Sequence, residues 1–407
     1  MVRGALGLLL ATGLMALAGC SDSTSPAGPS GWSGGTATDA SGSDDAAGFD
    51  RDATTGGDAS GGADSDATSG NASDGSGTPD APATSNDSAT SNDSATSDDS
   101  QTGDAEATDS AAGLTLPVQR GGLDVLEFGN LQFAVNPAIG ARVVSFKLDA
   151  DELLTDASVN STYFGSSLWT SPVTDWSGLA NGLPPAALDA DPYTTTVSAA
   201  GVITATSNPV TINSKTFTVT KVFTADIPNQ AIVIDYKINN TGGAAFSIAA
   251  WEVTRVFGGG LTFFQTGTTI EPNISAQTMQ FQQALGDTWY DNTTEVAGNG
   301  DSQSFFDTPG GYLAHDAPNA NGDLLFIKTF PVITVAMAPP GQLPAAIYSN
   351  DPPNYNEVEE HSAYTSIAPG ATYTQTVHWY LRRLPIGTDR SVGSAALVAA
   401  VKAVIGK

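Results

Sequence analysis

Thr216-Phe-Thr-Val-Thr-Lys-Val-Phe (216–223) and Thr374-Gln-Thr-Val-His-Trp-Tyr-Leu (374–381) are the stretches of sequence that decide the fold. Both are rich in β-branched and aromatic residues, which favour extended strands. Apolar and polar residues largely alternate along them, as in strands that bury one face. We therefore predict β-strands at both places.

Similar runs occur on either side of these two stretches, and Gly, Pro, Asn and Asp separate them. Before them, the runs 123–135 and 141–148 flank the turn-forming sequence Asn136-Pro137-Ala138-Ile139-Gly140 and predict a hairpin. Further strands are predicted at 193–199, 202–206, 231–239, 246–256, 324–330, 345–348 and 355–360. More than ten strands with few helical periods predict an all-β fold, a large antiparallel sandwich.

The end of the chain has a different pattern. Leu397, Val398, Val401, Val404 and Ile405 follow a helical spacing, which predicts a short C-terminal helix. We divide the chain into a signal peptide (1–20), a linker (21–115), a β-sandwich domain (116–388) and a C-terminal tail (389–407).

The linker is predicted from composition. Eighteen of the 43 acidic residues lie between Ser21 and Gly113, together with one basic residue, Arg51. Ser, Thr, Asp, Ala and Gly dominate, and a Thr-Ser-Asn-Asp-Ser-Ala unit repeats at 84–89 and 90–95. The few apolar residues cannot bury enough surface to offset the conformational entropy lost on folding. We therefore predict a disordered spacer.

The first twenty residues predict attachment to a membrane. Arg3 precedes an apolar run, 6–17, that is too short for a membrane-spanning helix and fits a signal peptide. The run ends Leu17-Ala18-Gly19-Cys20, which resembles the bacterial lipobox. That resemblance implies a lipid on Cys20 and an envelope lipoprotein. Ser21 after the cysteine implies the outer membrane.

Charge and cysteine content exclude several function classes. The formal net charge is −28, and no cluster of Lys and Arg offers a phosphate-binding face, so nucleic acid is not an expected partner. One cysteine in 407 residues excludes a disulfide framework within the chain and any multi-cysteine zinc site. We expect no metal and no cofactor.

Several segments, in order, resemble the galactose mutarotase-like superfamily, and in particular a bacterial branch with a Trp-x-Ser-Pro motif. They are Phe133-Ala-Val-Asn-Pro-Ala-Ile-Gly-Ala-Arg-Val-Val-Ser-Phe, Leu168-Trp-Thr-Ser-Pro, Ala250-Trp-Glu-Val-Thr-Arg, Gly311-Tyr-Leu-Ala-His, Leu325-Phe-Ile-Lys-Thr-Phe, Glu357-Val-Glu and His378-Trp-Tyr-Leu. The resemblance spans about 120–384. It implies a β-supersandwich with a carbohydrate-binding cleft on the concave face of a sheet.

A sugar site needs flat aromatic rings for the C–H faces of the sugar and polar groups for its hydroxyls. Alternation places Glu357, Glu359 and His361 on one strand face, and it separates Glu252 from Trp251 and Arg255. Three titratable groups are costly to bury unpaired, so we expect them to line a wet cleft. The candidate platforms are Trp169, Trp176, Trp251, Trp289 and Tyr355, and the candidate polar partners are Arg142, Glu252, Arg255, Lys328, Glu357, Glu359 and His361.

Each candidate also has a purely structural interpretation. A tryptophan in a large β domain is more often part of the core, and Trp379 is expected there. Trp169, in what reads as a turn-rich loop beside Pro172, is the strongest platform candidate. Glu252 and Arg255 are candidates for a structural ion pair, and Lys328 for a solvent-side strand residue.

Mutarotation needs a base for the anomeric hydroxyl and an acid for the ring oxygen. The resemblance places Glu359 at the position of the catalytic base, whereas the family's Asn-His-x-Tyr-Phe-Asn motif has no counterpart. Only His315 or His361 remains as a candidate acid. Sugar binding without demonstrated turnover is therefore our first hypothesis. An active aldose 1-epimerase-like enzyme is the alternative, and a structural or adhesion module without a sugar site is the third.

Overall fold

A computed structural model describes residues 115–176, 184–275 and 278–406. The predicted signal peptide, the lipidation site Cys20 and the predicted linker up to residue 114 lie outside these ranges. Within the described residues, neither α-helix reaches the length and apolarity needed to cross a membrane.

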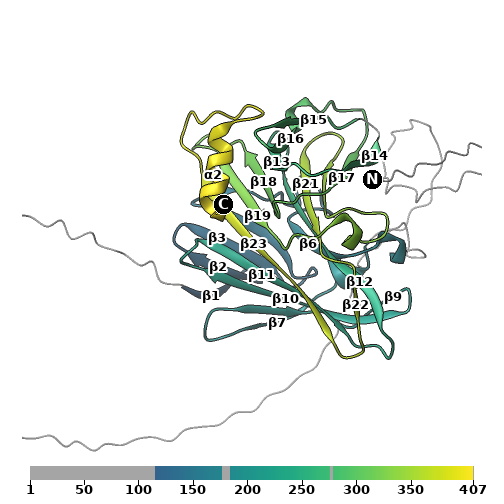
Figure 1. Cartoon of the computed structure of the whole chain (residues 1–407). Coiled ribbons are helices and arrows are strands. Elements are labelled where there is room, and N and C mark those ends of the chain that lie inside the picture. The colour runs from purple at the N-terminus through teal and green to yellow at the C-terminus, as the bar shows by residue number, and fades with distance from the viewer. Residues whose placement is uncertain (1–114, 177–183, 276–277, 407) are drawn as a thin grey trace, which may run out of the picture. The chain divides into compact units, whose positions relative to one another are not determined.

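Two large antiparallel sheets make up the described fold, and the first contains twelve strands (Figure 1). Their order is β1 (Thr115–Arg120), β2 (Leu123–Phe128), β3 (Leu131–Asn136), β4 (Arg142–Leu148), β6 (Ser166–Ser171), β12 (Phe246–Phe257), β21 (Tyr355–His361), β20 (Ala345–Ser349), β17 (Ser302–Phe306) and β14 (Ile270–Ser275), with β5 (Asp151–Glu152) beside β4 and β22 (Thr365–Ile367) beside β12.

The second sheet contains eleven strands among the described residues. Their order is β15 (Phe281–Ala284), β16 (Asp287–Asp291), β13 (Leu261–Gln265), β18 (Tyr312–Ala317), β19 (Leu324–Thr329), β23 (Thr372–Arg383), β11 (Ala231–Asn240), β10 (Lys215–Asp226), β8 (Ile203–Thr206) and β7 (Thr194–Val197), with β9 (Val210–Ile212) beside β10. The all-β prediction is confirmed, and the two quoted stretches form β10 and β23.

Aromatic side chains from both sheets pack together between them. Phe133 and Phe146 of the first sheet contact Trp379 of the second, with ring centroids 5.9 and 5.7 Å apart. Phe326 of β19 lies edge-on to Trp379 at 5.2 Å. Burying each such side chain stabilises the fold by roughly 1.5–3 kcal/mol, so these rings hold the sheets face to face. Trp379 is a core residue, as expected.

The predicted C-terminal helix is α2 (Ala395–Ile405), beside the second sheet in Figure 1. Ser394 caps its first turn by accepting a hydrogen bond from the backbone N–H of Leu397, and Gly406 ends it in the left-handed conformation. Leu397, Val398 and Val401 pack with Trp289 and Ile327 in a second apolar cluster. The helix therefore covers part of the outer face of that sheet.

The Trp-x-Ser-Pro segment differs from its prediction. Residues 166–171 form β6, and all six are buried. Trp169 consequently lies in the middle of a sheet and not in a turn-rich loop. Because both faces of β6 are covered, the strand shows no polar–apolar alternation, which explains why the pattern was missed.

Candidate functional site

Three neighbouring strands, β6, β12 and β21, present one continuous row of candidate residues. Trp251 pairs with Trp169 on one side and with His361 on the other. Arg255 pairs with Glu357, and Val253 pairs with Glu359. Paired residues in an antiparallel sheet project from the same face. The intervening residues face the second sheet, since Thr254 contacts Lys328 of β19, so the row lies on the outer face.

Indole rings form the apolar part of this face. Trp251 stacks on Trp176 at a centroid distance of 5.8 Å and an interplanar angle of 20°. Trp169 meets Trp251 edge-on at 5.2 Å, and His361 stacks on the other end of Trp251 at 5.1 Å. Trp176 is brought there by the short 3-10 helix η1 (Val173–Trp176) that follows β6. Three of the predicted platforms therefore share one cluster.

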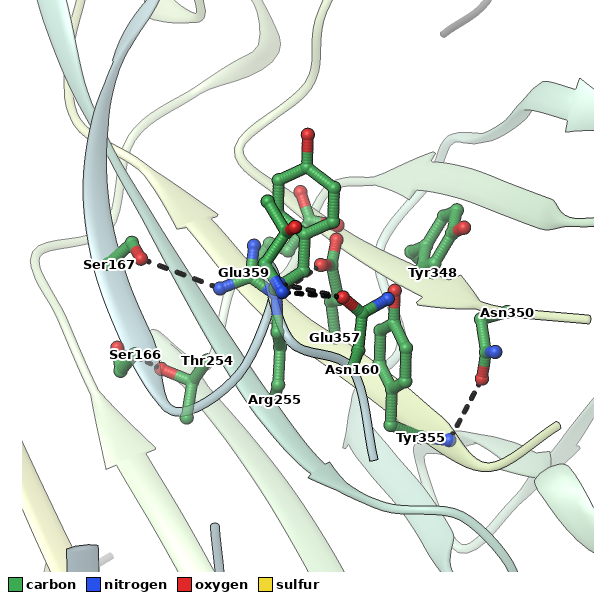
Figure 2. Close-up of polar contacts among 12 residues, drawn as sticks. Asn160, Ser166, Ser167, Thr254, Arg255, Tyr348, Asn350, Tyr355, Glu357 and Glu359 are labelled. Carbon is green, nitrogen blue, oxygen red and sulfur yellow. Dashed lines mark hydrogen bonds and ion pairs between the residues drawn. The ribbon is translucent and has the colours of Figure 1, made fainter. Parts of the chain in front are cut away.

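Arg255 is the centre of the polar part (Figure 2). Its Nε donates to Glu357 Oε1 at 2.7 Å, and its Nη1 donates to Ser167 Oγ at 3.5 Å. Its guanidinium also lies 5.1 Å from the ring centre of Trp169. Since Arg255 is completely buried, its charge depends on Glu357 for compensation.

Glu359 lies next to Glu357 on the same strand face and has different partners. Trp251 Nε1 donates to its Oε2 at 2.7 Å, and Gln303 Nε2 of β17 donates to its Oε1 at 2.9 Å. Burial, followed by the negative charge of Glu357, raises the pKa of Glu359 to about 8. Burial raises the pKa of Glu357 as well, although Arg255 and a hydrogen bond with Glu359 oppose this effect. Glu359 therefore holds a proton at neutral pH, beside the Glu357 carboxyl group that pairs with Arg255.

Two tyrosines extend the polar face beyond Glu357. Tyr355 precedes it on β21, and Tyr348 is its partner on β20. Burial and the neighbouring negative charges raise the pKa of both phenols, so both stay protonated. Their ring centres are 6.1 Å apart. They place two hydroxyl groups beside the carboxyl pair.

Arg142 joins the cluster from β4 through a residue that sequence reasoning did not assign to the site. Its Nη2 donates to Asp189 Oδ2 at 2.9 Å, and Trp169 Nε1 donates to Asp189 Oδ1 at 3.0 Å. Asp189 ends the short helix α1 (Ala186–Asp189). This carboxylate therefore orients Trp169 and links it to Arg142.

Glu252 and Lys328 lie on the opposite face, between the sheets. Lys328 Nζ is 3.5 Å from Glu252 Oε1 and also forms an ion pair with Glu360. Burial, together with the charge of Glu252, raises the pKa of Glu360 well above its usual value. Alternation correctly separates Glu252 from Trp251 and Arg255, and the proposed Glu252–Arg255 ion pair does not form. Neither Glu252 nor Lys328 belongs to the outer face.

His315 and Trp289 are also away from this face. His315 sits on β18 of the second sheet, where its Nδ1 is 2.9 Å from Thr262 Oγ1. Trp289, on β16, stacks on Phe263 in the apolar cluster under α2. His361 does lie on the outer face, where its Nε2 is 3.0 Å from Gln342 Nε2. Burial lowers the pKa of both histidines to about 3, so both imidazoles are neutral at physiological pH.

The outer-face residues are buried, which differs from the expected wet cleft. Glu359 is 0% and Trp251 is 7% exposed. Residues between β5 and β6 cover Arg255: the Thr155 N–H donates to its carbonyl oxygen, and the Tyr163 ring lies 5.4 Å from its guanidinium. Figure 2 includes Asn160, whose side chain accepts the backbone N–H of Tyr163 and so shapes this loop.

Several buried polar atoms around the cluster make no hydrogen bond within the described part of the chain. They are Trp176 Nε1, Arg255 Nη2, Ser171 Oγ and Gln342 Oε1. Leaving such a group unpaired costs about 1–3 kcal/mol. The described residues also contain no group of three or more His, Cys, Asp or Glu side chains arranged to hold a metal ion.

No protein-family model and no curated protein matches the sequence. Solved structures do match it. A galactose mutarotase-like protein from Lactobacillus casei is 10% identical with a TM-score of 0.44, covering 64% of this chain and all of that one. A galactose mutarotase-like protein from Clostridium acetobutylicum is 8% identical with a TM-score of 0.43, covering 67% and 99% of the two chains.

A galactose mutarotase related enzyme from Lactobacillus acidophilus is 8% identical with a TM-score of 0.43, covering 66% of this chain and all of that one. The solved structures similar to this chain thus include galactose mutarotase-like proteins, the superfamily that the sequence motifs resemble.

Proposed function

We propose that the outer face of the first sheet binds a carbohydrate. The observation that carries this proposal is a cluster in which indole N–H groups donate to buried carboxyl groups, Trp251 to Glu359 and Trp169 to Asp189, beside the Glu357–Arg255 ion pair. Aromatic faces suit the C–H faces of a pyranose, and carboxylates accept hydrogen bonds from its hydroxyls.

Binding is tested on the full chain with galactose, glucose and N-acetylglucosamine by isothermal titration calorimetry. We expect at least one of these sugars to bind, and Glu359→Gln to weaken that affinity about tenfold. The carboxyl group accepts hydrogen bonds from Trp251 and Gln303 through two oxygens, whereas the amide offers one oxygen, and a lost hydrogen bond costs about 0.5–1.5 kcal/mol. Glu271→Gln, at an exposed carboxylate on β14 of the same sheet, is the matched control and keeps the affinity.

Absence of binding for all three sugars would refute the proposal and favour the structural or adhesion module. Equal affinity in the wild type and Glu359→Gln would show that the sugar binds elsewhere on the molecule.

Turnover is the second candidate function, and the raised pKa of Glu359 favours it. A carboxyl group with a pKa of about 8 holds its proton at neutral pH and is suited to act as a general acid. Its neighbour Glu357, paired with the Arg255 cation, is the natural base. This assignment reverses the expected role of Glu359. It also replaces the expected histidine acid, because His361 has no proton to give as an imidazolium.

The proposed reaction exchanges sugar anomers. Glu357 removes the proton from the anomeric hydroxyl while Glu359 gives its proton to the ring oxygen, and the bond between the anomeric carbon and the ring oxygen breaks. Rotation of the resulting aldehyde and reversal of both proton transfers closes the other anomer. No other reactant is consumed, and the carboxyl pair returns to its starting state.

Turnover is tested by measuring anomer exchange with saturation-transfer NMR on the sugar that binds. We expect acceleration that disappears in both Glu357→Gln and Glu359→Gln and persists in Glu271→Gln. Binding without acceleration would leave the protein as a carbohydrate-binding module and exclude the epimerase candidate.

The proposal includes an envelope location, which rests on the Leu17-Ala18-Gly19-Cys20 sequence. A lipid on Cys20, the one cysteine of the sequence, anchors the domain, and replacing this residue removes the attachment point. Cys20→Ser is expected to abolish incorporation of radiolabelled palmitate in bacterial cells and to release the protein from the membrane fraction. Continued labelling of the variant would contradict the anchor.

A further inference from the structure

Two of the indoles on the outer face are held by their own N–H groups, whereas the indole of Trp176 is not. Trp251 donates to Glu359, and Trp169 donates to Asp189. The indole N–H of Trp176 makes no hydrogen bond within the described part of the chain. Its ring nevertheless stacks on Trp251, with the ring centroids 5.8 Å apart. The position of Trp176 must therefore be fixed by something other than its own polar atom.

Asp175, the residue before Trp176 in η1, is anchored by the other sheet. It is buried, and its carboxylate forms an ion pair with Lys215, the first residue of β10. Asn213, in the turn between β9 and β10, donates from its Nδ2 to Asp175 Oδ1 at 3.0 Å. Both oxygens of this carboxylate therefore have partners at one corner of the second sheet.

Lys215 also connects this carboxylate to β12, the strand that carries Trp251. Its Nζ donates to the carbonyl oxygen of Ser247 on β12 at 2.7 Å. The side chains of Lys215 and Asp175 are both largely buried, so their attraction is only weakly screened by water. One cation thus joins η1 and β12, the two elements whose indoles stack on each other.

We propose that Lys215 and Asp175 are positioning residues of the outer-face site, because their ion pair holds η1 against β12 and so fixes the Trp176 ring on Trp251. Neither side chain contacts the sugar in this proposal. The inference rests on the proposed carbohydrate site and makes part of its aromatic surface depend on the second sheet. The two charged residues are 40 positions apart in the chain, so no local sequence pattern connects them.

Far-ultraviolet circular dichroism of the full chain reports the position of Trp176 without a ligand. Neighbouring indoles couple electronically, and the resulting signal depends on their distance and relative orientation. The difference between the spectra of the wild type and Trp176→Phe defines the contribution of Trp176. We expect Lys215→Met and Asp175→Ala to lose this contribution, and Lys215→Arg, which keeps the cation, to retain it. Lys237→Met, on the neighbouring strand β11, is the matched control and also retains it.

The same variants are titrated with galactose, glucose and N-acetylglucosamine. We expect Lys215→Met and Asp175→Ala to weaken the affinity of the sugar that binds roughly threefold to tenfold, as for the loss of one aromatic contact. Lys215→Arg and Lys237→Met keep the affinity. Cooperative urea unfolding shows that each variant is folded. Asp175→Ala changes no strand, so it tests the same contact even if Lys215→Met does not fold.

The two measurements separate this inference from the proposed function. An unchanged Trp176 signal in Asp175→Ala and Lys215→Met overturns the inference, whether or not the wild type binds a sugar. Loss of the signal with unchanged sugar affinity also overturns it, because the pair would then position nothing that the site uses. Loss of the signal in a protein that binds none of the three sugars supports the positioning of Trp176 and refutes the proposed function.

Discussion

Neighbouring residues with opposite environments control the chemistry of the outer face. Glu357 pairs with Arg255, whereas Glu359 accepts hydrogen bonds from two uncharged donors. Both carboxyl groups are buried to the same extent, so the partner decides which one keeps a proton at neutral pH. The protonation of a single residue can be tested by measuring the free energy of unfolding as a function of pH.

Glu359→Gln tests the raised pKa of Glu359. Between the usual glutamate pKa of 4.5 and about 8, the folded protein holds a proton that the unfolded chain releases. The wild type therefore loses stability as pH rises through this window, by up to about 1.4 kcal/mol per pH unit. Glutamine mimics the protonated acid and removes this loss. We expect urea unfolding to show a larger free-energy advantage of the variant over the wild type at pH 8 than at pH 5. The same difference in free energy of unfolding at both pH values would contradict the raised pKa.

Lys221 provides the opposite case. Its Nζ is buried and donates to the carbonyl oxygen of Gly140 at 2.6 Å, and burial lowers its pKa to about 7. Between pH 7 and 10.5 the unfolded chain binds the additional proton, so this residue makes stability rise with pH. In Lys221→Met we expect the rise to be smaller than in the wild type, by about 1.4 kcal/mol per pH unit at most. Parallel stability curves would show that the amine stays charged.

Among the elements, strands with clear alternation or a mainly apolar run could be predicted from sequence, whereas two short strands of the first sheet, β6 and β17, could not. β10 and β23 have twelve residues each and alternate, because only one face of each packs on the core. β6 and β17 are buried on both faces and mix polar with apolar residues, which leaves no periodic signal. β20 is equally short and buried, yet its apolar residues were enough to predict a strand at 345–348.

The candidate site shows the same division. Alternation along β12 and β21 correctly predicted which residues share a face, including the separation of Glu252 from Trp251. Gln303 and Tyr348 were missed, because their approach to Glu359 and Glu357 depends on the strand order β21-β20-β17. Asp189 was missed because α1 reaches β6 through tertiary packing. Contacts between residues far apart in the chain cannot be predicted from the local sequence pattern.

Helix α2 makes a testable contribution to the second sheet. Leu397 is fully buried in the cluster with Trp289 and Ile327. We expect Leu397→Ala to lower the free energy of unfolding by about 2–5 kcal/mol through lost burial and the cavity that remains. The exposed Lys402 on the same helix is the control, and Lys402→Ala should change stability by less than about 0.5 kcal/mol. Thermal and urea unfolding measure both; equal effects would mean that the helix does not dock as described.

At the scale of the whole domain, Lys328 joins the two sheets electrostatically. It extends from β19 to Glu252 and Glu360 on the first sheet. Lys328→Met leaves these carboxyl groups without a cation, so we expect a loss of roughly 3–5 kcal/mol in urea unfolding. The half-exposed Lys237 of β11 serves as the control, since Lys237→Met should have an effect within about 0.5 kcal/mol. A similar small effect for Lys328→Met would show that the pair contributes little.

Glu359 and Glu360 are consecutive residues that point to opposite faces of one strand. One belongs to the outer cluster, and the other belongs to the ion pairs between the sheets. Both side chains are buried, so one backbone position of β21 has to satisfy the outer cluster and the ion pairs at the same time. A ligand or substitution that shifts β21 on its outer side is therefore expected to change the ion pairs on its inner side, which would link occupancy of the outer face to the stability of the sandwich.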